Sequence, residues 1–325
     1  MNASTQAIKL SAYGDAGNLE LVTHSLPPLA ADAVRVRQHA AGVNYVDVYQ
    51  RLGRYPLPLP AVLGVEGSGV IDAIGAAVSS LKVGQRVAWS AICGGYAGVV
   101  DLPAARVIAL PDSVSFEQAG TGTLRGMTVY LLLNHYARLQ RGQTVLVHAA
   151  AGGLGLMLTQ WAKTLGAIVI GTVSSDEKAA LAQSRGLDHV INYRRQDFVK
   201  EAMDITGGKG VDLVVDGIGG DNLLRSIQAT RSGGMAITIG SVSGDGATPE
   251  SLSAAQARGV LLERPSILTF MKELSQYRLA ADAAVAQWQA GLMVDIGGRL
   301  PLSQAAEAHR LLESGAVQGS LVLTF

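Results

Sequence analysis

A short glycine-rich segment offers the clearest chemistry in the sequence. It reads Ala149-Ala-Ala-Gly152-Gly153-Leu154-Gly155 and follows the apolar run TVLV. Residues with small side chains let a phosphate approach the backbone N–H groups, and the helix that follows presents its positive end. The dinucleotide spacing G-x-G-x-x-G is met at 150, 152 and 155, with Ala150 in the first position. The segment predicts a cradle for a dinucleotide pyrophosphate, and the alternative is a purely structural turn.

Residues further along bear on which dinucleotide this cradle would hold. Ser174 and Lys178 follow the next apolar run, and Tyr193 and Arg194 follow the one after it. Hydroxyl groups beside cations suit a 2′-phosphate, which carries negative charge and strong acceptors. We therefore predict NADP(H). The alternative is that Lys178 and Arg194 are solvated surface charges.

One acidic residue argues for NAD instead. Asp176 lies at about the distance from the glycine loop, some 20 residues, at which an acid binds the NAD ribose. However, the preceding strand is expected to end at Val173, so that Asp176 and Glu177 fall in a first helical turn. Acids are favoured there by the helix dipole alone.

These residues need a parallel sheet to bring them together. Apolar runs without polar alternation begin at Thr144, Ala167, His189, Val211 and Met235, and helical segments are expected at 153–165, 176–186, 196–206 and 220–230. Strands that alternate with helices indicate a parallel sheet covered on both faces. We predict a Rossmann-type, doubly wound cofactor domain over residues 124–265.

The flanking parts of the chain have another pattern. Before residue 124, short segments with alternating apolar residues predict a β-rich domain with one short helix at 44–51. After residue 265, helices are expected near 269–290 and at 303–313, followed by a strand, SLVLTF. The predicted fold class is α/β, with a β-rich domain formed from residues 1–123 and 266–325.

Composition excludes several classes of protein. The 325 residues include 26 basic and 26 acidic ones, so no net field recruits nucleic acid or an anionic membrane. The apolar run at 128–133 is much shorter than a membrane span of about 20 residues. The N-terminal segment reads as a strand rather than a signal peptide. The single Cys93 cannot form an internal disulfide, which fits a cytoplasmic location.

Several long stretches resemble the medium-chain dehydrogenase/reductase superfamily. They are AAGVNYVDVYQRLGRYPLPLPAVLGVEGSGVIDAIG and LKVGQRVAW. A second set narrows the resemblance to the zinc-independent, zeta-crystallin-like quinone oxidoreductases: LRGMTVYLLL, HAAAGGLGLMLTQWAKTLGAIVIGTV, VINYR, ERPSI and HRLLESGAVQGSLVLTF. The resemblance covers nearly the whole chain. It implies a GroES-like catalytic domain beside the Rossmann domain.

The metal ligands of the zinc enzymes in that superfamily are missing from the sequence. Those enzymes place a Cys and a His-Glu pair where this chain reads GVNYVD and LGVEGSG, so only Glu66 remains. Cys93 and the six histidines offer no zinc-ligand spacing. We therefore predict no metal. Hydride delivery to an electron-poor acceptor needs less polarisation than alcohol oxidation does.

The resemblance implies that four residues line the nicotinamide and substrate cleft: Asn44, Asp47, Tyr49 and Tyr55. Asn44 can contact the nicotinamide ribose, and the tyrosines offer flat faces and hydroxyl donors for a developing oxyanion. Asp47 is expected to orient its neighbours. Packing and helix capping are the alternative roles. Arg125 and Thr128 lie next to the cleft in the family, with structural roles equally open.

The resemblance also implies a set of cofactor-binding residues. They are Asn44, Thr128, Gly152, Gly153, Leu154, Gly155, Ser174, Lys178, Tyr193, Gly240, Ser241, Leu262 and Arg264. At one position the sequence departs from the pattern of the family, and that position bears on binding of the 2′-phosphate. Bacterial relatives often carry an arginine where this chain reads Gly315-Ala316, so NADP affinity could be weaker, Arg194 could compensate, or Gly315 could be a helix C-cap.

The predicted function is an NADPH-dependent quinone oxidoreductase that needs no metal. The first alternative is a reductase of alkenal, enone or enoyl double bonds, since a fold does not fix its substrate. An RNA-binding or nucleotide-sensing protein is a further alternative that the zero net charge disfavours. A homodimer is expected by resemblance, through edge strands near 235–264. The sequence leaves open the physiological acceptor and whether reduction takes one or two electrons.

Overall fold

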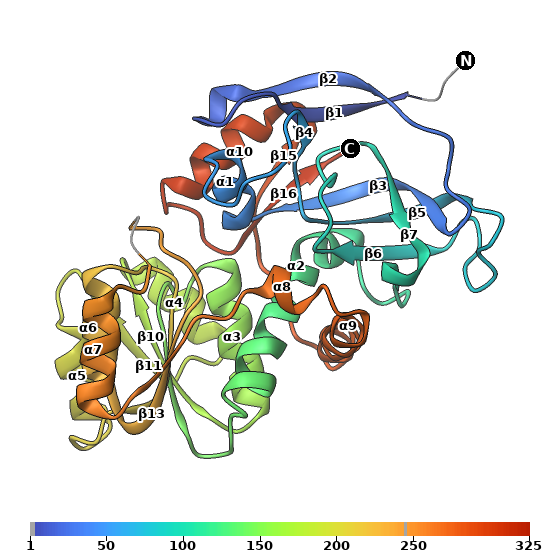
Figure 1. Ribbon diagram of the computed structural model, residues 1–325. Coiled ribbons are helices and arrows are strands. Elements are labelled where there is room, and N and C mark those ends of the chain that lie inside the picture. The colour runs from blue at the N-terminus through green and yellow to red at the C-terminus, as the bar shows by residue number, and fades with distance from the viewer. Residues whose placement is uncertain (1–3, 244–245) are drawn as a thin grey trace. The chain divides into compact units, whose positions relative to one another are not determined.

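The computed structural model describes residues 4–243 and 246–325, and the chain divides into two compact units (Figure 1). Unit 1 comprises Met1–Met127 and Met271–Phe325, and unit 2 comprises Thr128–Phe270. Unit 2 is thus formed by one continuous segment, whereas unit 1 combines two segments of the chain.

Unit 2 is built on a parallel sheet. Its elements are η3 (Tyr130–Tyr136, a π-helix), β9 (Thr144–Val147), α3 (Gly153–Thr164), β10 (Ile168–Val173), α4 (Asp176–Ser184), β11 (His189–Asn192), α5 (Phe198–Ile205), β12 (Val211–Asp216), α6 (Asp221–Ala229), β13 (Thr230–Thr238), α7 (Pro249–Arg258), β14 (Leu261–Glu263) and α8 (Ile267–Phe270). The strand order is β11-β10-β9-β12-β13-β14, and every neighbouring pair is parallel. The order reverses between β9 and β12, which is where ligands bind in such sheets.

Helices cover both faces of this sheet because its strands are apolar on both sides. Helices α5, α6 and α7 pack side by side on one face, with α3 on the opposite face (Figure 1). Phe198 and Ala202 of α5 pack on Leu146, Ile170 and Val214, which lie on three adjacent strands. This packing holds the carboxyl ends of the strands at one edge.

Unit 1 is rich in β-strands. Its elements are β1 (Ser4–Leu10), η1 (Ala16–Asn18), β2 (Leu19–Ser25), β3 (Ala33–Val43), α1 (Tyr45–Arg51), β4 (Ala61–Val62), β5 (Glu66–Ile74), β6 (Arg86–Ser90), β7 (Val99–Pro103), η2 (Ala104–Arg106), β8 (Ile108–Ala109), α9 (Leu274–Gln289), β15 (Ile296–Pro301), η4 (Leu302–Gln304), α10 (Ala305–Glu313) and β16 (Ser320–Thr324). Helix α2 (Phe116–Val129) begins in unit 1, and its last residues, Thr128 and Val129, belong to unit 2.

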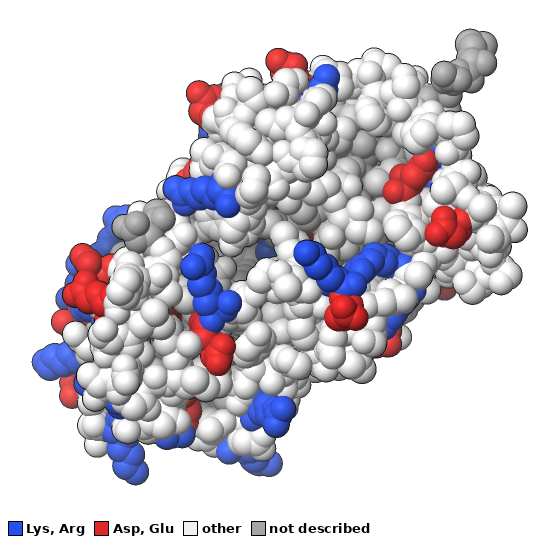
Figure 2. All heavy atoms as spheres, viewed as in Figure 1, with Lys and Arg blue, Asp and Glu red and all other residues white. Residues whose placement is uncertain are grey.

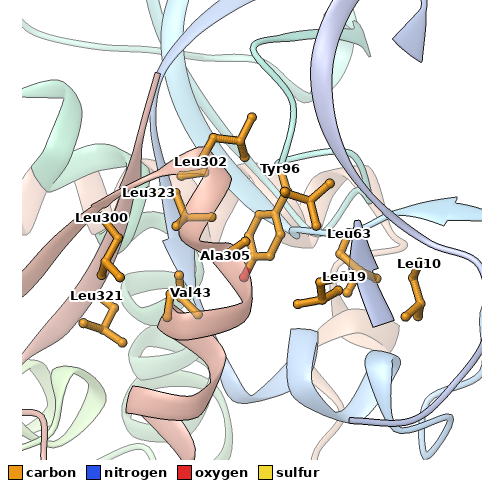
Figure 3. Close-up of a cluster of buried hydrophobic side chains, with 13 residues drawn as sticks. Leu10, Leu19, Val43, Leu63, Tyr96, Leu300, Leu302, Ala305, Leu321 and Leu323 are labelled. Atoms are coloured by element: carbon orange, nitrogen blue, oxygen red, sulfur yellow. The ribbon is translucent and has the colours of Figure 1, made fainter. Parts of the chain in front are cut away.

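From Ser4 onward, the strands of unit 1 form two sheets. One has the order β2-β1-β4, and the other has the order β15-β16-β3-β5-β6-β8 with β7 also paired to β3. Strand β16 pairs antiparallel with β3, and Leu321 lies opposite Val43. The two ends of the chain therefore share one sheet and one core, in which leucines from both segments surround the ring of Tyr96 (Figure 3).

The predicted α/β fold class is confirmed, with local differences. Strand β13 begins at Thr230 rather than Met235. The five residues before Met235, TRSGG, form part of the strand but are polar or glycine, so the apolar pattern did not reveal them. The helix expected near 269–290 is two helices, α8 and α9. Helices α2 and α7 were not predicted, although Thr248 and Pro249 form a readable N-terminal cap for α7.

Surface charge follows the balanced composition. On the face shown in Figure 2, basic and acidic side chains are interspersed in small groups. Within residues 4–243 and 246–325, no helix has the length and hydropathy that a membrane span requires.

Candidate functional site

The glycine loop lies between β9 and α3, at the switch point of the sheet. Ala149 has a φ of +51°, in the left-handed region. The N–H of Ala150 donates to the carbonyl of Thr172 on β10 (3.0 Å), and the N–H of Gly152 donates to the carbonyl of Ala149 (2.9 Å). Gly152 is the N-cap of α3, so the amides of the first turn, from Gly153 onward, lack intrahelical acceptors. This geometry suits an anion at the helix N-terminus.

Close packing explains the small residues of the loop. A Cβ on Gly155 would lie 2.4 Å from the carbonyl oxygen of Ala149, so no side chain fits there. A Cβ on Gly152 would lie 3.3 Å from the same oxygen. Ala150 occupies the first glycine position because Gly171 on β10 leaves room for it: a Cβ on Gly171 would lie 2.6 Å from the Cβ of Ala150.

The residues predicted to meet the 2′-phosphate lie at one corner of this sheet. Ser174 directly follows β10, and the N–H of Tyr193 donates to the carbonyl of Val173 (3.1 Å), which brings the ends of β10 and β11 together. Burial, and then the nearby Arg194 guanidinium, lower the pKa of Lys178. Two cations and a hydroxyl therefore share this corner.

Asp176, the acidic residue at the same corner, already interacts with two other side chains. Oδ2 of Asp176 lies 3.2 Å from Nη1 of Arg195, and Nδ2 of Asn192 donates to its Oδ1 (3.3 Å). Ser175 caps α4 by accepting from the N–H of Lys178 (3.3 Å). The expectation that Asp176 belongs to a first helical turn is confirmed.

The remaining predicted cofactor residues of unit 2 are spread along it. Gly240 and Ser241 follow β13, where the N–H of Val242 donates to the carbonyl of Gly217 after β12 (3.3 Å). Leu262 lies in β14 opposite Ala236, and Arg264 follows that strand. These positions share the carboxyl edge of the sheet with the glycine loop. Thr128 lies in α2 instead, as the first residue of unit 2.

The four residues predicted to be catalytic lie in unit 1, around α1. The backbone N–H of Asn44, the N-cap of α1, donates to Oδ2 of Asp47 (2.9 Å). The amide Nδ2 of Asn44 donates to Oε1 of Glu66 on β5 (2.8 Å). All three side chains are buried. Asp47 thus orients the start of the helix, and Asn44 is fixed by a carboxylate.

The Glu66 carboxylate forms a buried ion pair with Arg125. Nη1 of Arg125 lies 3.3 Å from Oε1 of Glu66, and its Nη2 donates to the carbonyl of Val43 (2.9 Å). The N–H of Leu124 donates to Oε2 of Glu66 (2.7 Å). Burial raises the pKa of Glu66, while the guanidinium and the two other donors act in the opposite direction. Burial also lowers the pKa of Arg125.

Asp47 begins a second buried chain of hydrogen bonds. The hydroxyl of Tyr96 donates to Oδ2 of Asp47 (3.1 Å) and lies 3.1 Å from Nε2 of His309. Among the described residues, Oδ1 of Asp47 has no hydrogen-bond partner. Burial raises the pKa of Asp47 to about 7, because the charged form has lost its hydration. Burial likewise lowers the pKa of His309 to about 3.

The tyrosines form an aromatic group at α1 and the loop after it. The rings of Tyr49 and Tyr55 meet edge to face at a centroid distance of 5.3 Å, and the Tyr45 ring lies 6.1 Å from that of Tyr49. The guanidinium of Arg54 lies 5.7 Å from the Tyr49 ring. Tyr49 is only 6% exposed and Tyr55 is 41% exposed. Tyr55 is therefore the ring that a ligand can reach.

Sequence reasoning missed several residues of these networks. Tyr96, His309 and Gly171 belong to no sequence motif, because their roles arise from contacts between distant segments. Gly315 has a φ of +65° directly after α10 and its C-cap Ser314, so its backbone favours glycine. In the described parts of the chain, no three His, Cys, Asp or Glu side chains group so that they could hold a metal ion.

Comparison with known proteins places the chain among enzymes. Residues 30–112 match the model for "Alcohol dehydrogenase GroES-like domain", and residues 153–284 match the model for "Zinc-binding dehydrogenase". Quinone oxidoreductase 1 of Escherichia coli K12 is 36% identical over 322 residues, which cover 97% of this chain and 98% of that protein. A 2-haloacrylate reductase of a Burkholderia species is 37% identical over 303 residues, which cover 89% of this chain and 90% of that protein.

A solved structure agrees with these matches. The Escherichia coli quinone oxidoreductase crystallised with NADPH superposes with a TM-score of 0.93 at 35% sequence identity, covering 98% of this chain and all of that one. Sequence identity at this level over nearly the full length of both proteins, together with the same fold, identifies the family. The chain belongs to the quinone oxidoreductase family of the medium-chain dehydrogenase/reductase superfamily.

Proposed function

We propose that this chain is an NADPH-dependent quinone oxidoreductase that passes a hydride to a quinone without a metal. The observation that carries the proposal is the glycine loop closed over Gly155, with Ser174, Lys178 and Arg194 at the corner beside it. Bound NADPH would supply the hydride. The relatives named quinone oxidoreductase, one of them crystallised with NADPH, support this assignment.

In this proposal, different residues of unit 2 contact different parts of NADPH. Amides at the start of α3, from Gly153 and Leu154, would receive the pyrophosphate. Ser174, Lys178 and Tyr193 would hold the 2′-phosphate and the adenosine end. Gly240, Ser241, Leu262, Arg264 and Thr128 would contact the rest of the cofactor. In this proposal unit 2 is the NADP-binding domain, and unit 1 is the catalytic domain.

In unit 1, Asn44 and Tyr55 are the residues we propose to meet the reacting groups. The Asn44 amide is fixed by Glu66, so it can orient the nicotinamide ribose. Tyr55 has an exposed ring to stack on an aromatic substrate and a hydroxyl to donate to a developing oxyanion. Asp47 and Tyr49 would support these two, because both are buried against them.

The buried ion pair supports chemistry without a metal. Glu66 is the carboxylate that remains from the His-Glu pair of zinc enzymes, and it accepts from the Arg125 guanidinium and from Asn44. A fixed cation and two N–H donors occupy three of the roughly four acceptor sites of that carboxylate, so a divalent ion would have to compete with them. We expect activity to survive dialysis against a chelator.

A second candidate function is reduction of an activated carbon–carbon double bond. The match to a 2-haloacrylate reductase favours it, since that protein is as similar in sequence as the quinone oxidoreductases. Tyr55 could serve either reaction, because both place negative charge on an oxygen conjugated with the acceptor carbon.

Stopped-flow oxidation of NADPH separates the two functions. We expect rapid single-exponential loss of NADPH with 1,4-benzoquinone and naphthoquinones, and slow loss with 2-haloacrylate and 2-alkenals. Turnover with the alkenes and none with any quinone would assign the second function. Parallel runs with NADH give the cofactor preference.

The assembly and the location of the protein are further parts of the proposal. Strand β14 is an edge of the unit 2 sheet and exposes Leu261, which suits pairing with a second copy in a homodimer. Light scattering of the protein and of Leu261→Lys tests this, with the variant expected at half the mass. The lone, half-buried Cys93 fits a cytoplasmic location, which cell fractionation would test.

A further inference from the structure

His148 lies in a line of four hydrogen-bonded side chains in unit 2, Asp216–Ser226–His148–Thr172. It directly follows β9 and directly precedes Ala149 of the glycine loop. Its Nδ1 lies 3.0 Å from Oγ1 of Thr172 on β10, and its Nε2 lies 2.9 Å from Oγ of Ser226 on α6. The side chain therefore joins three elements of the unit.

The line ends at a carboxylate, which fixes the direction of the two hydrogen bonds of Ser226. Oγ of Ser226 donates to Oδ2 of Asp216 at 2.7 Å, because an ionised carboxylate only accepts. Ser226 must then accept from Nε2–H of His148. In the neutral ring this tautomer leaves Nδ1 to accept from the Thr172 hydroxyl.

The surroundings of the ring keep it in this state. His148 is buried, and its ring meets Phe198 edge to face at 4.8 Å. The facing charged groups are Asp216 and Arg225, which act on the imidazole in opposite directions, and burial is the larger effect, lowering the pKa of His148. The ring is therefore a fixed donor and acceptor.

The same line reaches the loop backbone at two points. Thr172 contacts His148 through its hydroxyl, and its carbonyl accepts from the N–H of Ala150 (3.0 Å). Ala149, between His148 and Ala150, has its φ of +51° in a region that costs non-glycine residues free energy. A conformation of this kind persists only where its surroundings hold it on both sides.

We propose that His148 is a positioning residue for the dinucleotide loop, acting through the line Asp216–Ser226–His148–Thr172. This inference rests on the proposed function, since it concerns how the loop binds NADPH. The line holds Ala149–Gly152 in the binding shape before the cofactor arrives. The loop is then ordered when the chain folds, so NADPH binding does not carry the entropic cost of ordering it.

The test compares His148→Phe with the wild-type chain. Phenylalanine keeps the ring against Phe198 but can neither accept from Thr172 nor donate to Ser226. In the cofactor-free protein we expect amide hydrogen exchange at Ala150 and Gly152 to quicken about tenfold, the factor for one lost hydrogen bond. The Kd values of NADPH and NADH should rise by a similar factor, because the loop contacts the part that both share. Turnover at saturating NADPH should stay within about twofold, which corresponds to well under 1 kcal/mol.

Two further variants separate positioning from general destabilisation. His148→Gln keeps an N–H for Ser226 and should recover part of the affinity. Val211→Ala removes buried core volume at the opposite end of β12 and serves as the matched control. It should lower the stability of unit 2 and leave both Kd values unchanged.

The outcomes are distinguishable. If the wild-type chain does not bind NADPH, the proposed function is wrong and this role is wrong with it. If the wild-type chain binds NADPH but His148→Phe shows unchanged exchange or unchanged Kd values, only the positioning role is overturned. The role is also overturned if Val211→Ala weakens binding as much as His148→Phe does.

Discussion

The Arg125 guanidinium lies 3.3 Å from the Glu66 carboxylate, and both side chains are buried in unit 1. Removing one partner of such a pair leaves an uncompensated buried charge, which costs about 3–5 kcal/mol. Arg125→Met should therefore lower the free energy of unfolding by about that amount, measured by urea denaturation at neutral pH.

The double variant Arg125→Met/Glu66→Gln provides the control. It removes both charges, so it should be more stable than Arg125→Met alone, even though Asn44 loses an ionised acceptor. A double variant as unstable as the single one would show that packing, rather than charge, explains the loss.

Asp47 should give the protein a distinctive dependence on pH. Its pKa is about 7 in the folded chain and about 4 when unfolded, so the folded state holds this proton more tightly. The contribution to stability is complete below pH 4 and is lost as the pH rises to 7, by about 2–4 kcal/mol. Asp47→Asn mimics the protonated form and should flatten the stability curve between pH 4 and 7. Asp72→Asn, an exposed carboxylate, should leave the curve as it is.

Lys178→Ala tests the phosphate corner. The Kd of NADPH should rise at least about tenfold, because a charge-assisted contact is lost, and the Kd of NADH should stay within about twofold. The NADPH effect should shrink at high salt. Lys200→Ala on the exposed face of α5 is the matched charge control. Equal losses for NADPH and NADH would place Lys178 away from the 2′-phosphate.

Tyr55→Phe tests the proposed donor to the oxyanion. If the hydroxyl stabilises developing charge, turnover with quinone should fall about tenfold or more while the KM for NADPH is unchanged. Tyr136→Phe removes a hydroxyl elsewhere and should have no effect. Unchanged turnover in Tyr55→Phe would leave the ring with a packing role against Tyr49.

Gly171→Ala tests how the loop accommodates Ala150. The new methyl group would lie 2.6 Å from the Cβ of Ala150 and 2.8 Å from Leu187, so the loop must shift. We expect lower thermal stability and a Kd for NADPH at least about threefold higher. Adding Ala150→Gly should recover part of both losses. Additive effects in the double variant would show that the two residues do not compete for space.

The parallel sheet could be predicted because its signal is local. Most of its strands contain a buried apolar run that a helix follows, so the order of elements is readable from about 20 residues at a time. The register between strands and the extension of β13 back to Thr230 were not readable, since they depend on pairing with Val211 of β12.

The candidate site was only partly predictable for the same reason. Gly155 and Lys178 fall at fixed distances along one segment, so a motif can locate them. Tyr96 hydrogen-bonds Asp47, and His309 reaches that carboxylate only through the Tyr96 hydroxyl, although both residues are far from Asp47 in the sequence. Such contacts exist only once the sheets have formed, and a single sequence carries no trace of them.

The pairing of β16 with β3 has a consequence for how the protein is made. A ribosome releases unit 2 as one uninterrupted segment, so that unit can fold while synthesis continues. Unit 1 has a different history, because β3 emerges early and must keep its open edge until β16 leaves the exit tunnel. Until then β3 is a template for pairing with other chains. Chaperone demand during synthesis should therefore be concentrated on the part of β3 that awaits β16.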